Sequence, residues 1–212
     1  ATGVPTSFAV LLSQASSSSL LVALMIAALG CIVLGMGMPT LPAYIAIISV
    51  MGPTLQGLGM DLLAAHMFVF FFGVAAGITP PVALTAFAAA SVSGGRPIAT
   101  AVAAPRIGAM MFLIPFAWAF DDALLLGIGE ATWSEVATAI AFLLAALYFC
   151  ISALIGHDRG ALSMWERTAR LGVTVALLSP VASAEIGGLV AGAALIAYRV
   201  FVAVPQASQK VG

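Results

Sequence analysis

Charge is what this sequence has least of. Of its 212 residues, 7 are Lys or Arg and 8 are Asp or Glu, so charged side chains make up 7% of the chain, against roughly a quarter in soluble domains. No charged residue precedes Asp61, and the next is Arg96, so the uncharged stretches far exceed the ~18 apolar residues that indicate a membrane span. A soluble enzyme is excluded, and a net charge of −1 provides no basic surface for nucleic acid. The chain is predicted to be an integral membrane protein.

Signatures of catalysis and metal binding are also missing. The two cysteines, Cys31 and Cys150, lie inside apolar stretches without metal-ligand spacing, and the chain contains neither HExxH nor GxSxG. An enzyme working inside the membrane would depend on His66, the one titratable side chain deep within the first two apolar segments. His66 follows Asp61 by about one helical turn, so a histidine at the membrane interface is an equally good interpretation. We therefore predict neither an enzyme nor a bound cofactor.

What the chain does contain is a series of long apolar segments. Backbone groups inside the hydrocarbon must bond to one another, which leaves helices or a closed barrel. The segments are rich in Ala, Leu and Gly and lack the alternation of barrel strands, so they predict an all-α, polytopic membrane protein. The predicted units are Leu20–Met51, Leu62–Ser93, Ile98–Phe120, Val136–Ile155 and Leu171–Tyr198.

The first two units are interrupted by glycine and proline. In the first, the sequence from Gly35 to Thr40 separates halves of about 22 and 17 Å, each shorter than a hydrocarbon core of ~30 Å, and this favours a re-entrant hairpin. In the second, the interruption is Ile78-Thr79-Pro80-Pro81. A single discontinuous span is the preferred interpretation there, and a second hairpin is the alternative.

Interrupted membrane helices offer unpaired backbone groups to a ligand. Carbonyl ends suit Na⁺ and half-helix N-termini suit carboxylates, an arrangement that recurs in secondary transporters. Thr79 is predicted to cap the returning half-helix, with Pro80 in its first turn, or else to ligate Na⁺. Gly35 and Gly37 permit a tight tip, and Thr40 is predicted to cap the helix that follows. The alternative at both places is a kink that serves packing only.

Acidic and basic residues alternate between the predicted loops. Arg96 and Arg106 lie near the start of the third unit, four acidic residues follow it, and Arg159, Arg167 and Arg170 follow the fourth. Because arginines in short loops mark the cytoplasmic side, the hairpin is predicted to enter from the external face. The side of the tail is left open, since Pro180 and Glu185 divide the last unit.

Three motifs between Gly35 and Gly95 carry a resemblance to a known family. GMGMPT, LAAHMFVFFFG and ITPPVALTAFAAA, in that order, resemble the second half of the large membrane subunit of TRAP transporters. The likeness is greatest to fused permeases that work with TAXI-type solute-binding proteins. The tail from Trp165 resembles the C-terminal extension of some fused members.

The resemblance implies an elevator-type, Na⁺-coupled importer of organic acids in the bacterial inner membrane, supplied by a periplasmic solute-binding protein. It implies that Gly35–Thr40 is the hairpin tip of the second of two inverted repeats and that Thr79–Pro81 is the helix break. The implied substrate and ion site comprises Gly35, Gly37, Pro39, Thr40, Thr79, Pro80 and Pro81, with Na⁺ near Gly35, Gly37 and Thr79. The alternative function is an ion channel or pore-forming protein.

The resemblance also implies an organisation and partners. Residues 1–19 would connect to a missing upstream half, residues 20–95 would form the transport repeat, residues 96–156 the membrane helices after it, and residues 157–212 a C-terminal extension with one further hydrophobic unit. The first ten residues contain no initiator methionine and no basic segment, and we expect the chain to be a C-terminal portion. Its partners would include the N-terminal repeat, a small membrane subunit or fused equivalent, and the lipid bilayer.

Overall fold

The computed structural model describes residues 20–125, 131–179 and 181–203. Within these residues every regular element is a helix, and the one β-bridge is the isolated pair His157 and Ala161. The predicted all-α fold is therefore confirmed. The chain divides into two compact units, residues 1–129 and residues 130–212.

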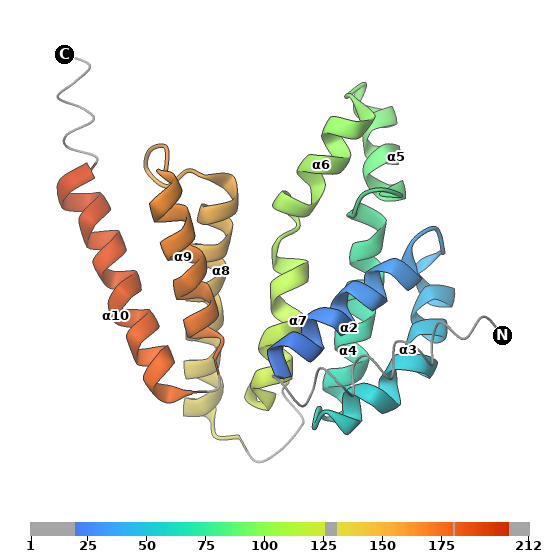
Figure 1. The fold of residues 1–212 in the computed structure, drawn as a ribbon, viewed down its shortest axis with the longest axis horizontal. Helices are drawn as coiled ribbons and strands as arrows, with labels where there is room; N and C mark the ends of the chain where they lie inside the picture. The colour runs from blue at the N-terminus through green and yellow to red at the C-terminus, as the bar shows by residue number, and fades with distance from the viewer. Residues whose placement is uncertain (1–19, 126–130, 180, 204–212) are drawn as a thin grey trace. The chain divides into compact units, whose positions relative to one another are not determined.

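The first unit is arranged around α4. Its helices are α2 (Leu20–Gly35), α3 (Thr40–Gly57), α4 (Leu62–Ala75), η1 (Ala76–Ile78), α5 (Leu84–Ser93), α6 (Pro97–Ile107), α7 (Met110–Phe120) and η2 (Asp122–Leu124). Helices α2, α3 and α7 pack on α4, whereas α5 packs on α6 (Figure 1). The segment α4–η1–α5 is thus accompanied along its length by α6 and α7, which run in the opposite direction.

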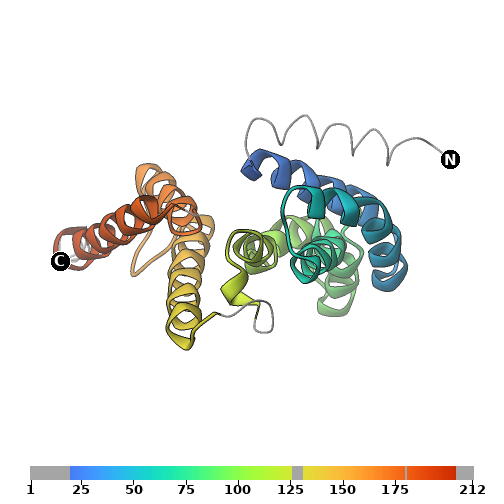
Figure 2. The same cartoon turned by 90° about the horizontal axis from the view of Figure 1, so that it is seen from below.

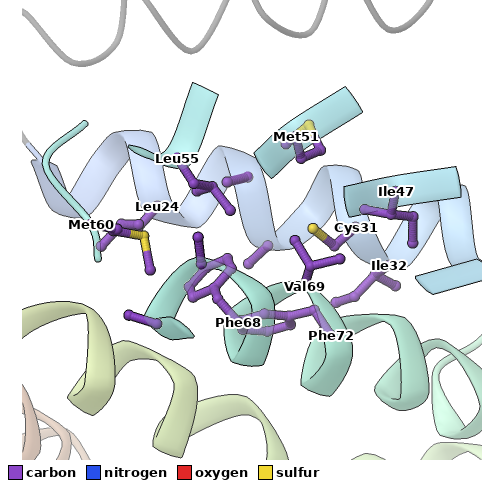
Figure 3. Packing of buried hydrophobic residues seen from close by; sticks show 14 of the residues in the cluster. Leu24, Cys31, Ile32, Ile47, Met51, Leu55, Met60, Phe68, Val69 and Phe72 are labelled. Carbon is purple, nitrogen blue, oxygen red and sulfur yellow. The ribbon is translucent and has the colours of Figure 1, made fainter. Parts of the chain in front are cut away.

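The core of this unit lies between α2, α3 and α4 (Figure 3). Phe68 and Phe72 of α4 are buried, and the ring of Phe116 from α7 meets both of them edge-on. Cys31 is fully buried in the same cluster. Phe68 and Phe72 therefore serve packing between the helices, whereas Phe70 of the same helix is exposed.

In its described residues, the second unit contains three α-helices, α8 (Trp133–Ile155), α9 (Met164–Leu177) and α10 (Ala182–Tyr198), followed by the π-helical turn η3 (Arg199–Ala203). Helix α9 contacts both of its neighbours and runs antiparallel to them (Figures 1 and 2). A capping box between Thr132 and Glu135 starts α8, and left-handed Gly156 ends it. Cys150 of α8 is buried.

Among the residues that the structure describes, three stretches are long and apolar enough to cross a membrane: Pro97–Phe120, Trp133–Ile155 and Ser183–Phe201. The fourth predicted unit, Val136–Ile155, agrees with α8. The third does not form one uninterrupted helix, because Gly108 and Ala109 separate α6 from α7.

The last predicted unit, Leu171–Tyr198, also differs from the structure. It contains the end of α9 and the whole of α10, and α9 begins earlier, at Met164. The physical reason is the carboxylate of Glu166, which accepts hydrogen bonds from the N–H and the hydroxyl of Ser163 and so satisfies a donor at the helix start. Arg167 and Arg170 therefore lie in a helix rather than in a loop.

Candidate functional site: two interrupted helical elements

Four of the predicted site residues lie in or directly beside the turn between α2 and α3. Gly37 has φ +79°, a left-handed conformation that glycine adopts without strain, and it is exposed. The carbonyl oxygen of Gly35 accepts a long hydrogen bond of 3.4 Å from the N–H of Met38. Pro39 is the N-cap residue of α3, and Thr40 is already its first helical residue. The predicted capping role of Thr40 is therefore wrong, because the cap position belongs to a proline without a side-chain acceptor.

The second interruption covers Thr79 to Ala83. The hydroxyl of Thr79 donates to the carbonyl oxygen of Ala75 at 2.7 Å, and its N–H donates to that of Ala76 at 3.2 Å. Thr79 thus closes the preceding helix and does not cap α5. Pro80 lies within the gap and not in the first turn of α5, so both of these predictions are wrong. Because a hydroxyl has two acceptor lone pairs, that of Thr79 can still ligate a cation while it donates to Ala75.

Ala83 holds the chain in an unusual conformation just before α5. It is the N-cap residue of α5, it is fully buried, and its backbone is left-handed, with φ 37° and ψ 44°. This conformation costs an L-residue roughly 1–2 kcal/mol. The surrounding structure must stabilise it, and such strained positions concentrate at functional sites.

The two interrupted elements meet at Gly35. A Cβ atom on Gly35 would lie 3.1 Å from the Cβ of Ala76 and 3.1 Å from the carbonyl oxygen of Gly73. The end of α2 therefore packs directly on the backbone of α4 and on η1, three residues before Thr79. Of the other predicted site residues, Thr79 is half-buried, and Gly37, Pro39, Thr40, Pro80 and Pro81 are exposed.

Both helices that follow the interruptions begin without a side-chain cap. Neither Pro39 before α3 nor Ala83 before α5 accepts a hydrogen bond through its side chain. The first N–H groups of these helices, except at Pro42, which has none, are therefore not occupied by a capping side chain and can bind an anionic group. No cluster of three or more His, Cys, Asp or Glu occurs among the described residues, so a cation at this site would be held by carbonyl and hydroxyl oxygens.

Gly108 is a residue of this region that the sequence analysis missed. It lies at the junction of α6 and α7, and a Cβ there would come within 2.7 Å of Cδ1 of Ile78, the last residue of η1. The junction adjoins a groove of about 650 Å³ lined by Ile78, Thr85, Met111 and small residues of α5 and α6. The available signal was Pro105 followed by Gly108 inside an apolar run.

His66 lies apart from the interruption. Its Nδ1 is 2.6 Å from the hydroxyl of Tyr44, and both side chains are half-buried beside a groove of about 670 Å³ that also contains Asp61. The twelve residues from His66 to Ile78 correspond to about 18 Å of helix. Within the described structure, His66 therefore supports the contact between α3 and α4 near the start of α4.

Comparison with known proteins identifies the family. No curated protein and no solved structure matches the chain significantly. Residues 1–133 match the family described as "Tripartite ATP-independent periplasmic transporter, DctM component". The match includes both interrupted elements, and together with the apolar helices it makes the chain a multi-pass membrane component of a transporter. The chain belongs to the DctM family, the large component of TRAP transporters.

Proposed function

We propose that the chain forms part of a Na⁺-coupled importer of organic acids in the bacterial inner membrane, supplied by a periplasmic binding protein of the TAXI type. In this proposal, residues 20–95 are the second inverted repeat of an elevator-type transport domain, with α2 and α3 as a re-entrant hairpin and α4–η1–α5 as a discontinuous span. The observation that carries the proposal is the contact of Gly35 with Gly73 and Ala76, since it joins the hairpin to the helix break.

The chemistry of the two interruptions fits an ion and an anionic substrate. Na⁺ would be held near Gly35, Gly37 and Thr79 by carbonyl oxygens and by the Thr79 hydroxyl. The uncapped N-termini of α3 and α5, next to Pro39, Thr40, Pro80 and Pro81, would face the substrate carboxylate. Leu41 and Pro42 follow the hairpin threonine, so the tip supplies no second hydroxyl directly after Thr40.

Partners would complete the transport domain. The first inverted repeat would supply the other hairpin and broken helix, and a small membrane subunit or its fused equivalent would accompany it. The exposed face of α2 offers apolar contacts for such partners or for lipid, through Leu21, Val22, Met25, Leu29 and Val33. An ion channel remains the alternative, and it would require the two interruptions to line a continuous pore.

Thr79→Val tests the proposed ion site. The substitution keeps the volume and removes the hydroxyl, and losing one ligand or hydrogen bond at a buried site costs ~1–3 kcal/mol, or about five- to 150-fold in affinity. We expect the complete transporter, reconstituted in vesicles, to need a correspondingly higher Na⁺ concentration for half-maximal uptake of substrate.

Thr138→Val is the matched control. The hydroxyl of Thr138 donates to the carbonyl oxygen of Ser134, four residues earlier, at 2.8 Å, which repeats the bond of Thr79 in the other unit. If Thr79→Val left the Na⁺ dependence unchanged at normal protein levels, the interruption would be a packing kink and the proposed ion site would be wrong.

A further inference from the structure

The C-terminal ends of α8 and α10 lie at the same end of the second unit. Arg199 follows the last residue of α10, and its guanidinium donates to the carbonyl oxygens of Gly160 and Ala161, in the loop that follows α8. Its Nε also lies 3.0 Å from Oε1 of Glu166, in the first turn of α9. Both α8 and α10 are long and apolar enough to cross a membrane. If both cross in the same direction, the chain must cross back between them.

We infer that α9 is a membrane crossing, although its length and polarity do not identify it as one. Its 14 residues give about 21 Å of helix at ~1.5 Å per residue. Hydrogen bonds from the N–H groups of Leu178 and Ser179 to the carbonyl oxygens of Thr174 and Ala176 extend the helical stretch by two residues, to about 24 Å. A span somewhat shorter than the hydrocarbon core of ~30 Å is accommodated by local thinning of the bilayer.

The distribution of side chains on α9 is the reverse of that on a water-soluble amphipathic helix. Three of its charged and polar residues are buried against the neighbouring helices: Glu166, Arg170 and Thr174 are between 1% and 6% exposed. Apart from Thr168 in the first two turns, its exposed side chains are apolar: Trp165, Leu171 and Val175 are between 40% and 58% exposed. A helix that buries its charges within the protein and exposes apolar side chains is suited to a lipid environment and not to water.

The buried charges are paired, which makes their place in the membrane energetically acceptable. Arg170 donates to the hydroxyl of Ser152 at 2.7 Å and to the carboxylate of Asp158, which also accepts from the hydroxyl of Tyr148 at 2.9 Å. Arg167 donates to the carbonyl oxygens of Ala153 and Leu154, at the end of α8.

These groups all lie at the end of the unit that contains the α8–α9 loop, where α9 begins and α10 ends. The aromatic rings of Trp165 and Tyr198, 5.6 Å apart, lie at the same end and mark the membrane interface. Exposed Arg159 lies in the loop itself. The concentration of arginines assigns this end to the cytoplasmic side.

Spin labels on the full chain in lipid vesicles test the environment of α9. In a background of Cys31→Ala and Cys150→Ala, a label at Val175 reports on the outer face of α9. Labels at Leu144, which is 61% exposed on α8, and at Arg159 in the loop are the controls. We expect the Val175 label, like the Leu144 label, to collide with oxygen and to be protected from a water-soluble nickel chelate. Exposure to the chelate, as at Arg159, or protection from both agents would overturn the inference.

Cysteine labelling tests the crossing itself. Single cysteines at Arg159 and at Ser183, the second residue of α10, are treated with a membrane-impermeant maleimide added to one side of the vesicles. If α9 crosses, the reagent labels the two positions from opposite sides. Labelling of both positions from one side would show that α9 does not cross. Both residues are exposed, so neither substitution removes a buried contact.

Discussion

Gly35→Val is expected to abolish most uptake by the complete transporter while leaving its insertion in the membrane intact. The new Cβ would lie 3.1 Å from both the Cβ of Ala76 and the carbonyl oxygen of Gly73, and the backbone oxygen has no side-chain freedom with which to move away. Overpacking of this kind costs ~1–3 kcal/mol. Relief requires that the end of α2 separate from η1, which would disturb both interruptions of the proposed site at once.

The measurement is initial uptake by vesicles at saturating Na⁺, and we expect a loss of tenfold or more. Gly187→Val in α10 is the control, because a Cβ at Gly187 meets nothing within 4 Å and the change carries the same substitution within a helix. Normal uptake by Gly35→Val would show that the contact between α2 and η1 is unimportant for transport.

Asp158→Asn is expected to destabilise the second unit by about 3–5 kcal/mol, the usual cost of leaving a buried charge without its partner. Arg170, the partner of Asp158, is only 1% exposed and would keep its charge. We propose to measure this as a faster hydrogen–deuterium exchange of the backbone amides of α9, from which the free energy of opening is obtained.

Two variants make the result specific to the pair. Glu135→Gln makes the same carboxylate-to-amide change at the exposed capping box of α8 and should leave the exchange rates of α9 unchanged. The double variant Asp158→Asn, Arg170→Met should recover a large part of the loss, because no buried charge is left unpaired. If the single and double variants lowered the free energy of opening equally, Asp158 and Arg170 would not be energetically coupled.

The same pair has a defined dependence on pH. Burial raises the pKa of Asp158, but the hydrogen bonds from Arg170 and Tyr148 and the positive charges of Arg170 and Arg159 outweigh it, so the pKa lies below its usual value. A lowered pKa means that the carboxylate stabilises the folded state fully above the unfolded-state pKa of ~3.9. This contribution is lost as the pH falls through the folded-state pKa.

Glycine and proline made the helix interruptions predictable from the sequence. The contacts between residues at these interruptions were not predictable. The turn at Gly35 to Thr40 and the gap after Ile78 were predictable because such residues end helices wherever they cluster. The roles of Thr40 and Thr79 were not, because a cap depends on the residue at which a helix begins, and sequence patterns place that residue only within a few positions.

The start of α9 was predicted wrongly because of its charged residues. Arg167 and Arg170 indicated a loop, since charged residues near the end of an apolar segment usually face water. Asp158 and Ser152, the partners of Arg170, lie on a loop and on α8, so only the folded arrangement reveals that its charge is satisfied inside the unit. The break at Gly108 was not predicted for a similar reason, because its contact with Ile78 joins residues 30 positions apart.

Each compact unit contains one thiol, and each thiol is buried. Cys31 lies in the core of the first unit at 0% exposure, and Cys150 lies on α8 of the second at 9%. A dye that fluoresces on reaction with thiols would therefore react with each unit only as that unit opens on heating. Two melting steps of equal amplitude would show that the units unfold independently, and a single step would show that they unfold together. The wild-type chain thus contains one natural thiol probe for the unfolding of each unit.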